Sequence, residues 1–298
     1  MEQDGKRALV FLETDGRAGI IAAMDVMPKT ARVDFVRRIS LGRGIMAVVF
    51  EGDVGAARSA LVAGKELASQ ICKIIASNII PGPHERILKL IMQKSGKAES
   101  VRSASADLAF GLVETLGFTG MMEAADAGIK AARVEIPGWL TVGGGMTSVF
   151  YRGDVGAVKA AVEAGENSAK KVTEVIGTLI IPRPHPGTEM ITPIGKPGET
   201  KYFSEVPEET ALGIIETRGF TGLIEAIDAG QKAAKITVQN WEKIGRGLVS
   251  TIFRGEVANV RAALEAGISG AKRAGGFAAS HFIARPHGAV EKAAMLEK

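Results

Sequence analysis

The last third of the chain carries the clearest alternation of hydrophobic and polar positions. Residues 211–216 form an apolar, β-prone run that predicts a buried strand. Residues 220–234 and 257–273 repeat apolar side chains at helical spacing, which predicts two amphipathic helices. Shorter β-prone runs at 235–238, 248–253 and 280–284 complete the unit. The predicted order is β-α-β-β-α-β, with the residues after 238 forming a loop up to Gly247.

The landmarks of this unit occur three times along the chain. The Gly-x-Gly turns are Gly42-Arg43-Gly44, Gly143-Gly144-Gly145 and Gly245-Arg246-Gly247, so the offset is 101 residues (42 to 143) and then 102 (143 to 245). A repeat of this length is a complete small domain with its own core. We therefore expect an α+β protein of three tandem ferredoxin-like domains at 1–92, 107–187 and 209–298. Residues 93–106 and 188–208 would be the linkers.

Composition narrows the possible classes of function. The chain is 46% hydrophobic, and its net charge of +4 comes without a dense Lys/Arg block or interleaved aromatics, so we expect no nucleic-acid partner. No apolar run is long enough to cross a bilayer, and the first residues lack the pattern of a signal peptide. Cys72 is the single cysteine, which excludes an intramolecular disulfide. These features predict a cytoplasmic protein with no membrane partner.

Candidate catalytic and ligand sites are weak in this sequence. A strand, rather than a helix, is predicted after each Gly-x-Gly turn, which argues against a nucleotide-binding loop. Three histidines recur at the repeat spacing (His84, His185 and His287) and therefore fall in separate domains, whereas a metal needs convergent ligands. A single cysteine also makes an iron–sulfur cluster improbable. Glu13, Glu114 and Glu216 only end buried strands, so we expect no enzyme activity, cofactor or metal.

Several runs together resemble the bacterial microcompartment shell domain. They are Ala211–Gly219, Ala226–Ala234, Lys243–Gly247 and Arg285-Pro286-His287, with closely similar runs in the second repeat and more divergent ones in the first. The resemblance implies the direct, unpermuted order of elements and a cytosolic hexagonal tile of a polyhedral shell. Two three-domain chains would complete a ring of six domains, so the expected partners are a second copy and other shell proteins edge to edge.

The resemblance also implies two sets of site residues. The glycine turns would line a central pore, namely Gly42, Arg43, Gly44, Gly143, Gly144, Gly145, Gly245, Arg246 and Gly247. Because arginines attract and grip anions, the pore would favour small anionic metabolites, unless these arginines fold away into salt bridges or plug the opening. The tile-edge contacts would be Lys29, Lys130, Lys232, Arg183, Arg285, His185 and His287. The plainer interpretation of the lysines is a solvated helix face.

A second class of function fits the same fold. Rings of ferredoxin-like domains also serve as metabolite or nucleotide sensors similar to the PII-type signalling proteins. Such a sensor binds its ligand between domains and carries a long loop between its second and third strands. Saturable nucleotide binding would favour the sensor, and closed shells or sheets would favour the tile.

Overall fold

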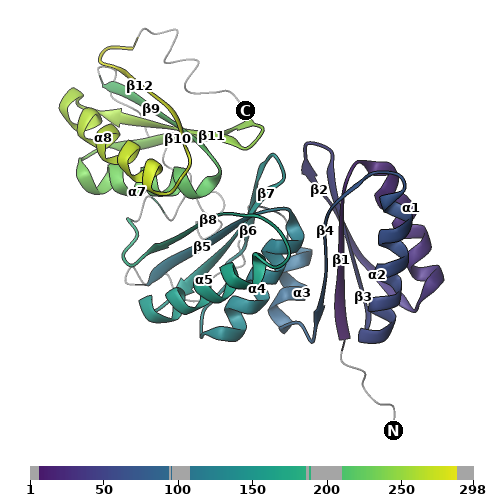
Figure 1. Cartoon of the computed structure of the whole chain (residues 1–298). Helices are drawn as coiled ribbons and strands as arrows, with labels where there is room; N and C mark the ends of the chain where they lie inside the picture. The colour runs from purple at the N-terminus through teal and green to yellow at the C-terminus, as the bar shows by residue number, and fades with distance from the viewer. Residues whose placement is uncertain (1–6, 94, 96–107, 186–187, 189–209, 287–298) are drawn as a thin grey trace.

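The computed structural model describes residues 7–93, 95, 108–185, 188 and 210–286, which form three similar units (Figure 1). Unit 1 contains β1 (Arg7–Asp15), α1 (Arg17–Thr30), β2 (Val33–Gly42), β3 (Ile45–Asp53), α2 (Val54–Ser69), β4 (Lys73–Pro81) and α3 (Glu85–Met92). Unit 2 contains β5 (Ala109–Leu116), α4 (Phe118–Ala131), β6 (Trp139–Gly143), β7 (Met146–Gly153), α5 (Val155–Ala169) and β8 (Val175–Ile181). Unit 3 contains β9 (Ala211–Arg218), α7 (Phe220–Ala233), β10 (Thr237–Gly245), β11 (Leu248–Gly255), α8 (Val257–Arg273) and β12 (Phe277–Ile283).

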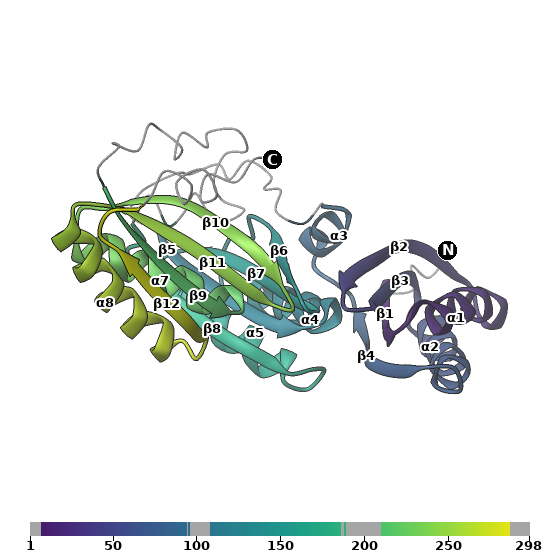
Figure 2. The same ribbon diagram turned by 90° about the horizontal axis from the view of Figure 1, so that it is seen from above.

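Each unit is a four-stranded antiparallel sheet with two helices on one face (Figure 2). The strand orders are β2-β3-β1-β4, β6-β7-β5-β8 and β10-β11-β9-β12. The predicted α+β class and the three ferredoxin-like units are therefore confirmed. Both helices predicted in unit 3 are also found, and α8 has the predicted bounds. The predicted linkers lie outside the described residues, apart from 93, 95 and 188.

The structure differs from the prediction in three respects. The second strand of unit 3 does not end at 238, because β10 continues to Gly245 and the expected loop is a two-residue turn. Register shifts at Val238/Asn240 and Lys243/Gly245 break the alternation that marks a strand in the sequence. The last strand, β12, also begins at Phe277, three residues before the predicted start at 280. Helix α3 was not predicted at all.

The first strand of unit 1 is buried on both faces. Ala8, Val10 and Leu12 face the core that the sheet forms with its own helices. Leu9 and Phe11 point the other way, into a core shared with unit 2. In the same way, Phe110 and Leu112 of β5 lie in the core of unit 3. Successive units are therefore joined by continuous hydrophobic cores, and the sheets of units 1 and 2 are each covered by the unit that follows.

Within the described residues, no helix has both the length and the hydropathy required to cross a membrane.

Candidate functional site: converging hairpins and the seams between units

The three Gly-x-Gly turns lie side by side where the hairpins of the three units converge (Figure 1). The backbone N–H of Gly145 donates to the carbonyl of Leu41 at 3.2 Å, which joins the hairpins of units 1 and 2. The Nζ atom of Lys243 donates to the carbonyl of Thr141 at 2.6 Å, which joins those of units 2 and 3. A side chain at Gly144 would place its Cβ 2.8 Å from the backbone nitrogen of Gly247. The structure thus brings together turns about a hundred residues apart in sequence.

Both arginines of these turns have unusual backbone conformations. Arg43 has φ 54° and Arg246 has φ 52°, whereas the third turn has Gly144 at φ 68°. The left-handed region costs a residue with a side chain about 1–2 kcal/mol and costs glycine little. The two arginine side chains are exposed at the tips of their hairpins. Glycine would suit the backbone better at both positions, so the chain keeps arginine there in spite of strain.

We call the two contacts between successive units the first seam (units 1 and 2) and the second seam (units 2 and 3). At the first seam, the carboxylate of Glu13 accepts hydrogen bonds from the backbone N–H and the hydroxyl of Thr119, at the start of α4. This carboxylate is completely buried, and burial raises its pKa to about 7 despite these bonds. Its Oε2 atom has no partner among the described residues.

The second seam repeats this contact with more hydrogen-bond donors to the carboxylate. Glu114 accepts from the backbone N–H groups of Phe220 (2.8 Å) and Thr221 (3.1 Å) and from the Thr221 hydroxyl (2.7 Å). The hydroxyl of Ser148 adds a fourth bond at 3.3 Å, whereas Ala47 occupies the matching position opposite Glu13. Burial still raises the pKa of Glu114 above its ordinary value. At both seams a carboxylate meets the first N–H groups of a helix, where the helix dipole favours negative charge.

An aromatic contact accompanies each carboxylate. Phe118 of α4 lies 6.5 Å from Phe11 across the first seam and 5.1 Å from Trp139 of its own unit, measured between ring centroids. At the second seam, Phe220 lies 6.2 Å from Phe150 across the seam and 5.1 Å from Trp241. The ring pairs are tilted or edge-to-face, which are the favoured geometries. The phenylalanine at the helix start and its tryptophan therefore recur at both seams, while the ring across the seam comes from β1 at the first and from β7 at the second.

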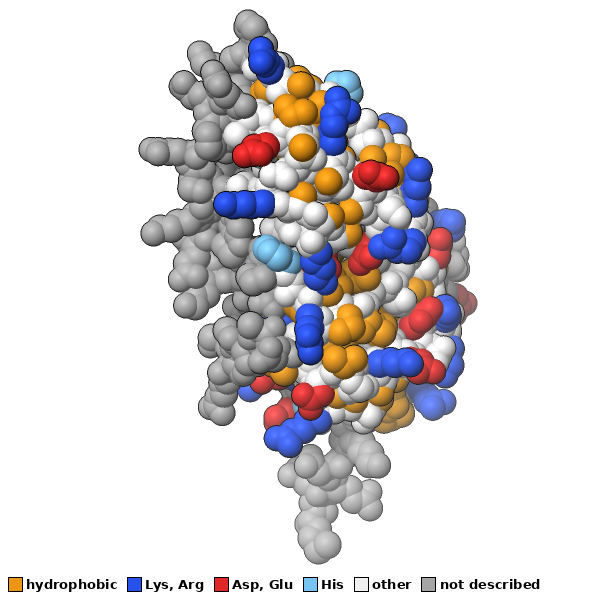
Figure 3. Space-filling view, turned by 90° about the vertical axis from the view of Figure 1, so that its left-hand side faces the viewer, with side chains coloured by type: hydrophobic (Ala, Val, Ile, Leu, Met, Phe, Trp, Pro, Cys, Tyr) orange, Lys and Arg blue, Asp and Glu red, His pale blue; other side chains and the backbone are white. Residues whose placement is uncertain are grey.

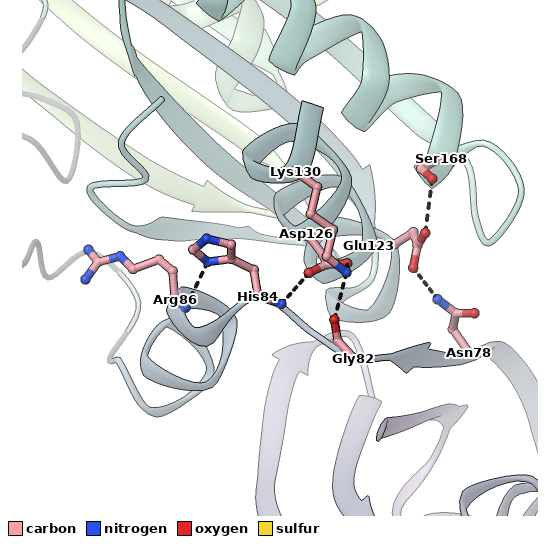
Figure 4. A network of polar contacts seen from close by, with 8 residues as sticks. All are labelled: Asn78, Gly82, His84, Arg86, Glu123, Asp126, Lys130 and Ser168. Carbon is pink, nitrogen blue, oxygen red and sulfur yellow. Dashed lines mark hydrogen bonds and ion pairs between the residues drawn. The ribbon is translucent and has the colours of Figure 1, made fainter. Parts of the chain in front are cut away.

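A polar network closes the rim of the first seam (Figure 4). Asp126 of α4 accepts from the backbone N–H of His84 at 2.8 Å and forms an ion pair with Lys130, whose Nζ atom also donates to the carbonyl of Gly82. Nearby, Asn78 donates to Glu123 at 2.7 Å. At the second seam Asp228 accepts from the backbone N–H of His185 at 2.9 Å and pairs with Lys232.

Comparison with known proteins identifies the repeated unit. The family described as "BMC domain" matches residues 8–83, 109–184 and 211–286, one match in each unit. The chain belongs to the BMC-domain family. It is similar to the carboxysome assembly protein CcmO of Synechocystis sp., with 35% identity over 185 residues, 60% of this chain and 62% of CcmO. The chain thus spans less than two thirds of the length of this curated relative.

Two other proteins are also similar to this chain, one over a shorter stretch and one at lower sequence identity. The bacterial microcompartment shell protein PduA of Salmonella typhimurium is 51% identical over 87 residues, which are 29% of this chain and 93% of PduA. A solved structure of a microcompartment protein from Desulfitobacterium hafniense is 26% identical, with a TM-score of 0.48, and covers 60% of this chain and 96% of its own.

The predicted edge residues of the three BMC domains lie in different surroundings. Lys29 is exposed and pairs only with Asp25 among the described residues. Lys130 and Lys232 are half-exposed at the rims of the two seams. Arg183 and Arg285 are exposed, whereas His287 lies outside the described residues. The pore and edge roles stay predictions, since the structure contains one copy of the chain.

The residues that hold the seams together were not predicted from the sequence. Glu13 and Glu114 were noticed only as the ends of strands, and Asp126 was not noticed. A signal was present, because Phe118-Thr119-Gly120 recurs as Phe220-Thr221-Gly222 at the start of the next helix. The first BMC domain has Arg17-Ala18-Gly19 at this position.

The turns also bear on the alternative of a sensor. Each of the three described turns between second and third strands has two residues, from Gly42 to Ile45, Gly143 to Met146 and Gly245 to Leu248. The long loop expected of a PII-type sensor is therefore not found between these strands. Among the described residues, no group of three His, Cys, Asp or Glu side chains could hold a metal ion.

Proposed function

We propose that this chain is a tile of a bacterial microcompartment shell, in which two copies close a ring of six BMC domains around a central pore. The observation that carries the proposal is the repeated seam, with the hairpin turns of all three domains meeting at one place. When the same joint occurs twice, the same rotation relates each domain to the next. In one chain the three domains are arranged around the converging turns, which supports the proposed ring (Figure 1). Related proteins named as shell or assembly proteins support a structural rather than a catalytic role.

The pore of such a ring would be lined by the nine residues of the glycine turns. Two copies would supply Arg43 and Arg246 twice each, hence four guanidinium groups, together with two copies of Gly144. Guanidinium groups at a narrow opening raise a positive potential and bind carboxylate or phosphate oxygens in pairs. The backbone strain at both arginines supports this role, since a purely structural turn is better served by glycine. The proposed cargo is therefore a small anionic metabolite.

The outer perimeter of the ring would contact neighbouring tiles. The side of units 2 and 3 away from the hairpins mixes Lys and Arg with exposed hydrophobic side chains (Figure 3). Between α8 and β12 a groove is lined by Arg261, Leu264 and Phe282, and the guanidinium of Arg261 lies 4.1 Å from the Phe282 ring centroid. This mixed surface suits edge-to-edge packing, with Lys130, Lys232, Arg183, Arg285 and His185 as the proposed contacts. Lys29 and His287 would join them where the edge of the first or last domain is exposed.

The pore is tested by converting its arginine turns to the glycine turn of the second domain. We expect phosphate to bind the assembled ring saturably in calorimetry, and the double variant Arg43→Gly/Arg246→Gly to abolish this binding. Because glycine relieves the left-handed strain, the free energy of unfolding should stay equal or rise by about 1–2 kcal/mol. Arg58→Gly, which removes an exposed arginine of α2, is the matched control and should keep phosphate binding. Unchanged phosphate binding in the double variant would contradict the pore assignment.

A further inference from the structure

In the first domain, helix α1 exposes a face that is covered on the matching helices of the other two domains. Ile21 of α1 is 51% exposed, whereas Met122 and Ile224 at the same position of α4 and α7 are completely buried in the seams. The side chain of Asp25 is 65% exposed, against 8% for Asp126. The start of α1 therefore exposes the surface that a neighbouring domain covers on α4 and α7.

The other end of the chain presents the matching acceptor face. Glu216 lies two residues before the end of β9, as Glu13 does in β1 and Glu114 in β5, yet Glu216 is only half-buried, and no described residue donates to its carboxylate. Ser250 lies opposite Glu216 in the sheet, as Ser148 lies opposite Glu114. Ile214 and Ile252 occupy the positions of Leu112 and Phe150 and are half-buried rather than buried. Strand β9 thus offers a carboxylate and an apolar surface with no following domain among the described residues.

We propose that the ring closes through an ionic seam, in which Glu216 receives the start of α1 of a second copy and pairs with Arg17 of that copy. The inference rests on the proposed ring and adds the chemistry of its closing contact. By continuity with the two internal seams, the carboxylate would accept from the backbone N–H groups of Arg17 and Ala18. The second copy is the occupant because its α1 face is the one described surface that repeats the covered faces of α4 and α7.

The closing seam differs chemically from the internal ones at two positions. Arg17 stands where α4 has Phe118, and Arg38 stands where β6 has Trp139, so two cations replace the aromatic pair. Ala18 replaces Thr119, which removes the hydroxyl that binds Glu13 across the first seam. Both arginines are exposed in the single chain. A buried cation needs a partner, and Glu216 is the carboxylate that the repeat places there.

An ionic seam has a consequence that an apolar seam lacks. Attraction between charges near the surface weakens as salt is added, because the Debye length falls from about 10 Å at 0.1 M to about 3 Å at 1 M. The two internal seams lie within one chain and have buried aromatic side chains where the closing seam has arginines. The ring should therefore open and close at the seams between chains, and salt should control the exchange.

Charge reversal at the closing seam tests the inference. Sedimentation equilibrium of the full chain would measure the dimer dissociation constant at about 50 and about 500 mM NaCl, which differ about tenfold in salt concentration. We expect the constant to rise about tenfold with salt, and about tenfold or more in Arg17→Glu and in Glu216→Arg. The double variant Arg17→Glu/Glu216→Arg should restore the wild-type constant to within about threefold. Arg58→Glu on α2 is the control for charge alone, and thermal melts verify that each variant folds.

The outcomes separate this inference from the proposed ring. If wild type has the mass of two copies and neither single variant weakens the dimer, the ionic seam is wrong and the ring stands. A double variant as weak as the single variants would also overturn the ionic pairing. A single-chain mass for wild type at all salt concentrations would overturn the ring and the seam together.

Discussion

The buried carboxylates Glu13 and Glu114 show how one residue type holds two seams with different strength. Each lies near the end of a strand and accepts hydrogen bonds from the first turn of a helix in the following domain. Ser148 gives Glu114 a further donor, whereas Ala47 leaves one oxygen of Glu13 without a partner among the described residues. Burial raises the pKa of both carboxylates, so both seams should respond to pH.

The raised pKa of Glu13 predicts the sign of this response. Between its ordinary pKa of 4.5 and its folded value of about 7, the folded chain holds a proton that the unfolded chain has released. The free energy of unfolding should therefore fall as pH rises through this window, by about 3 kcal/mol at most. Glu13→Gln should make this slope shallower in denaturant titrations at about pH 5, 6, 7 and 8, while Glu114 keeps its own contribution. The exposed Glu66→Gln is the control and should keep the slope.

A gain-of-donor variant adds a second arm to the same experiment. Ala47→Ser copies the arrangement of Ser148 and should lower the pKa of Glu13, because a hydrogen bond to the ionised form stabilises it. The pH-dependent loss should then be smaller than in wild type. A free energy of unfolding that rises with pH in wild type, or a slope that is unchanged in Glu13→Gln, would show that the Glu13 carboxylate is ionised at neutral pH in the fold.

At the scale of elements, helix α3 crosses from the first domain to the second. Its buried side chains, Ile87, Leu90 and Ile91, belong to the core shared with unit 2. The indole N–H of Trp139 donates to the carbonyl of Leu90 at 3.2 Å. The guanidinium of Arg86 donates to the carbonyl of Ile136 at 2.8 Å. Helix α3 thus covers the outer edge of the second sheet and reinforces the first seam.

Shortening a buried side chain of α3 should therefore destabilise the contact between the first and second domains. Leu90→Ala removes a completely buried side chain and should cost about 2–5 kcal/mol of unfolding free energy. The indole of Trp139 should become more solvent-accessible, which fluorescence quenching by iodide would measure. Met92→Ala truncates a 62% exposed side chain of the same helix and should change neither quantity measurably. Equal effects of the two variants would mean that α3 does not pack as described.

Element prediction succeeded where the hydrophobic period is regular and failed where packing breaks it. Helix α8 has the predicted bounds because apolar residues follow the helical spacing throughout. The length of strand β10 was underestimated because two register shifts and its polar side chains interrupt the alternation of apolar and polar residues. The apolar positions of α3 were visible in the sequence, but one short helix gives no sign of the domain it will cover.

At the scale of the whole molecule, three equal domains form a structure with two unlike ends. Each internal seam is heterologous, since a sheet face of one domain receives the helix start of the next. A heterologous contact that repeats produces a ring when its rotation closes and a helical filament when it does not. The exposed α1 face and the half-buried Glu216 are the two surfaces left to continue the series.

The candidate site was only partly predictable from sequence. The glycine turns could be found because backbone geometry demands glycine there, and the repeat showed that there are three. The seams could not, because Glu13 and Thr119 are 106 residues apart and neither has a local signature of contact. The left-handed conformation of Arg43 and Arg246 was also invisible, since arginine rarely adopts it.

The native mass of the full chain in low salt tests the central claim most directly. Two copies of the 31.2 kDa chain, or a stacked multiple of two, are predicted because two chains complete six domains. Native mass spectrometry would resolve this mass from those of one or three chains. A stable single chain, a trimer or an open series of increasing masses would contradict the six-domain ring.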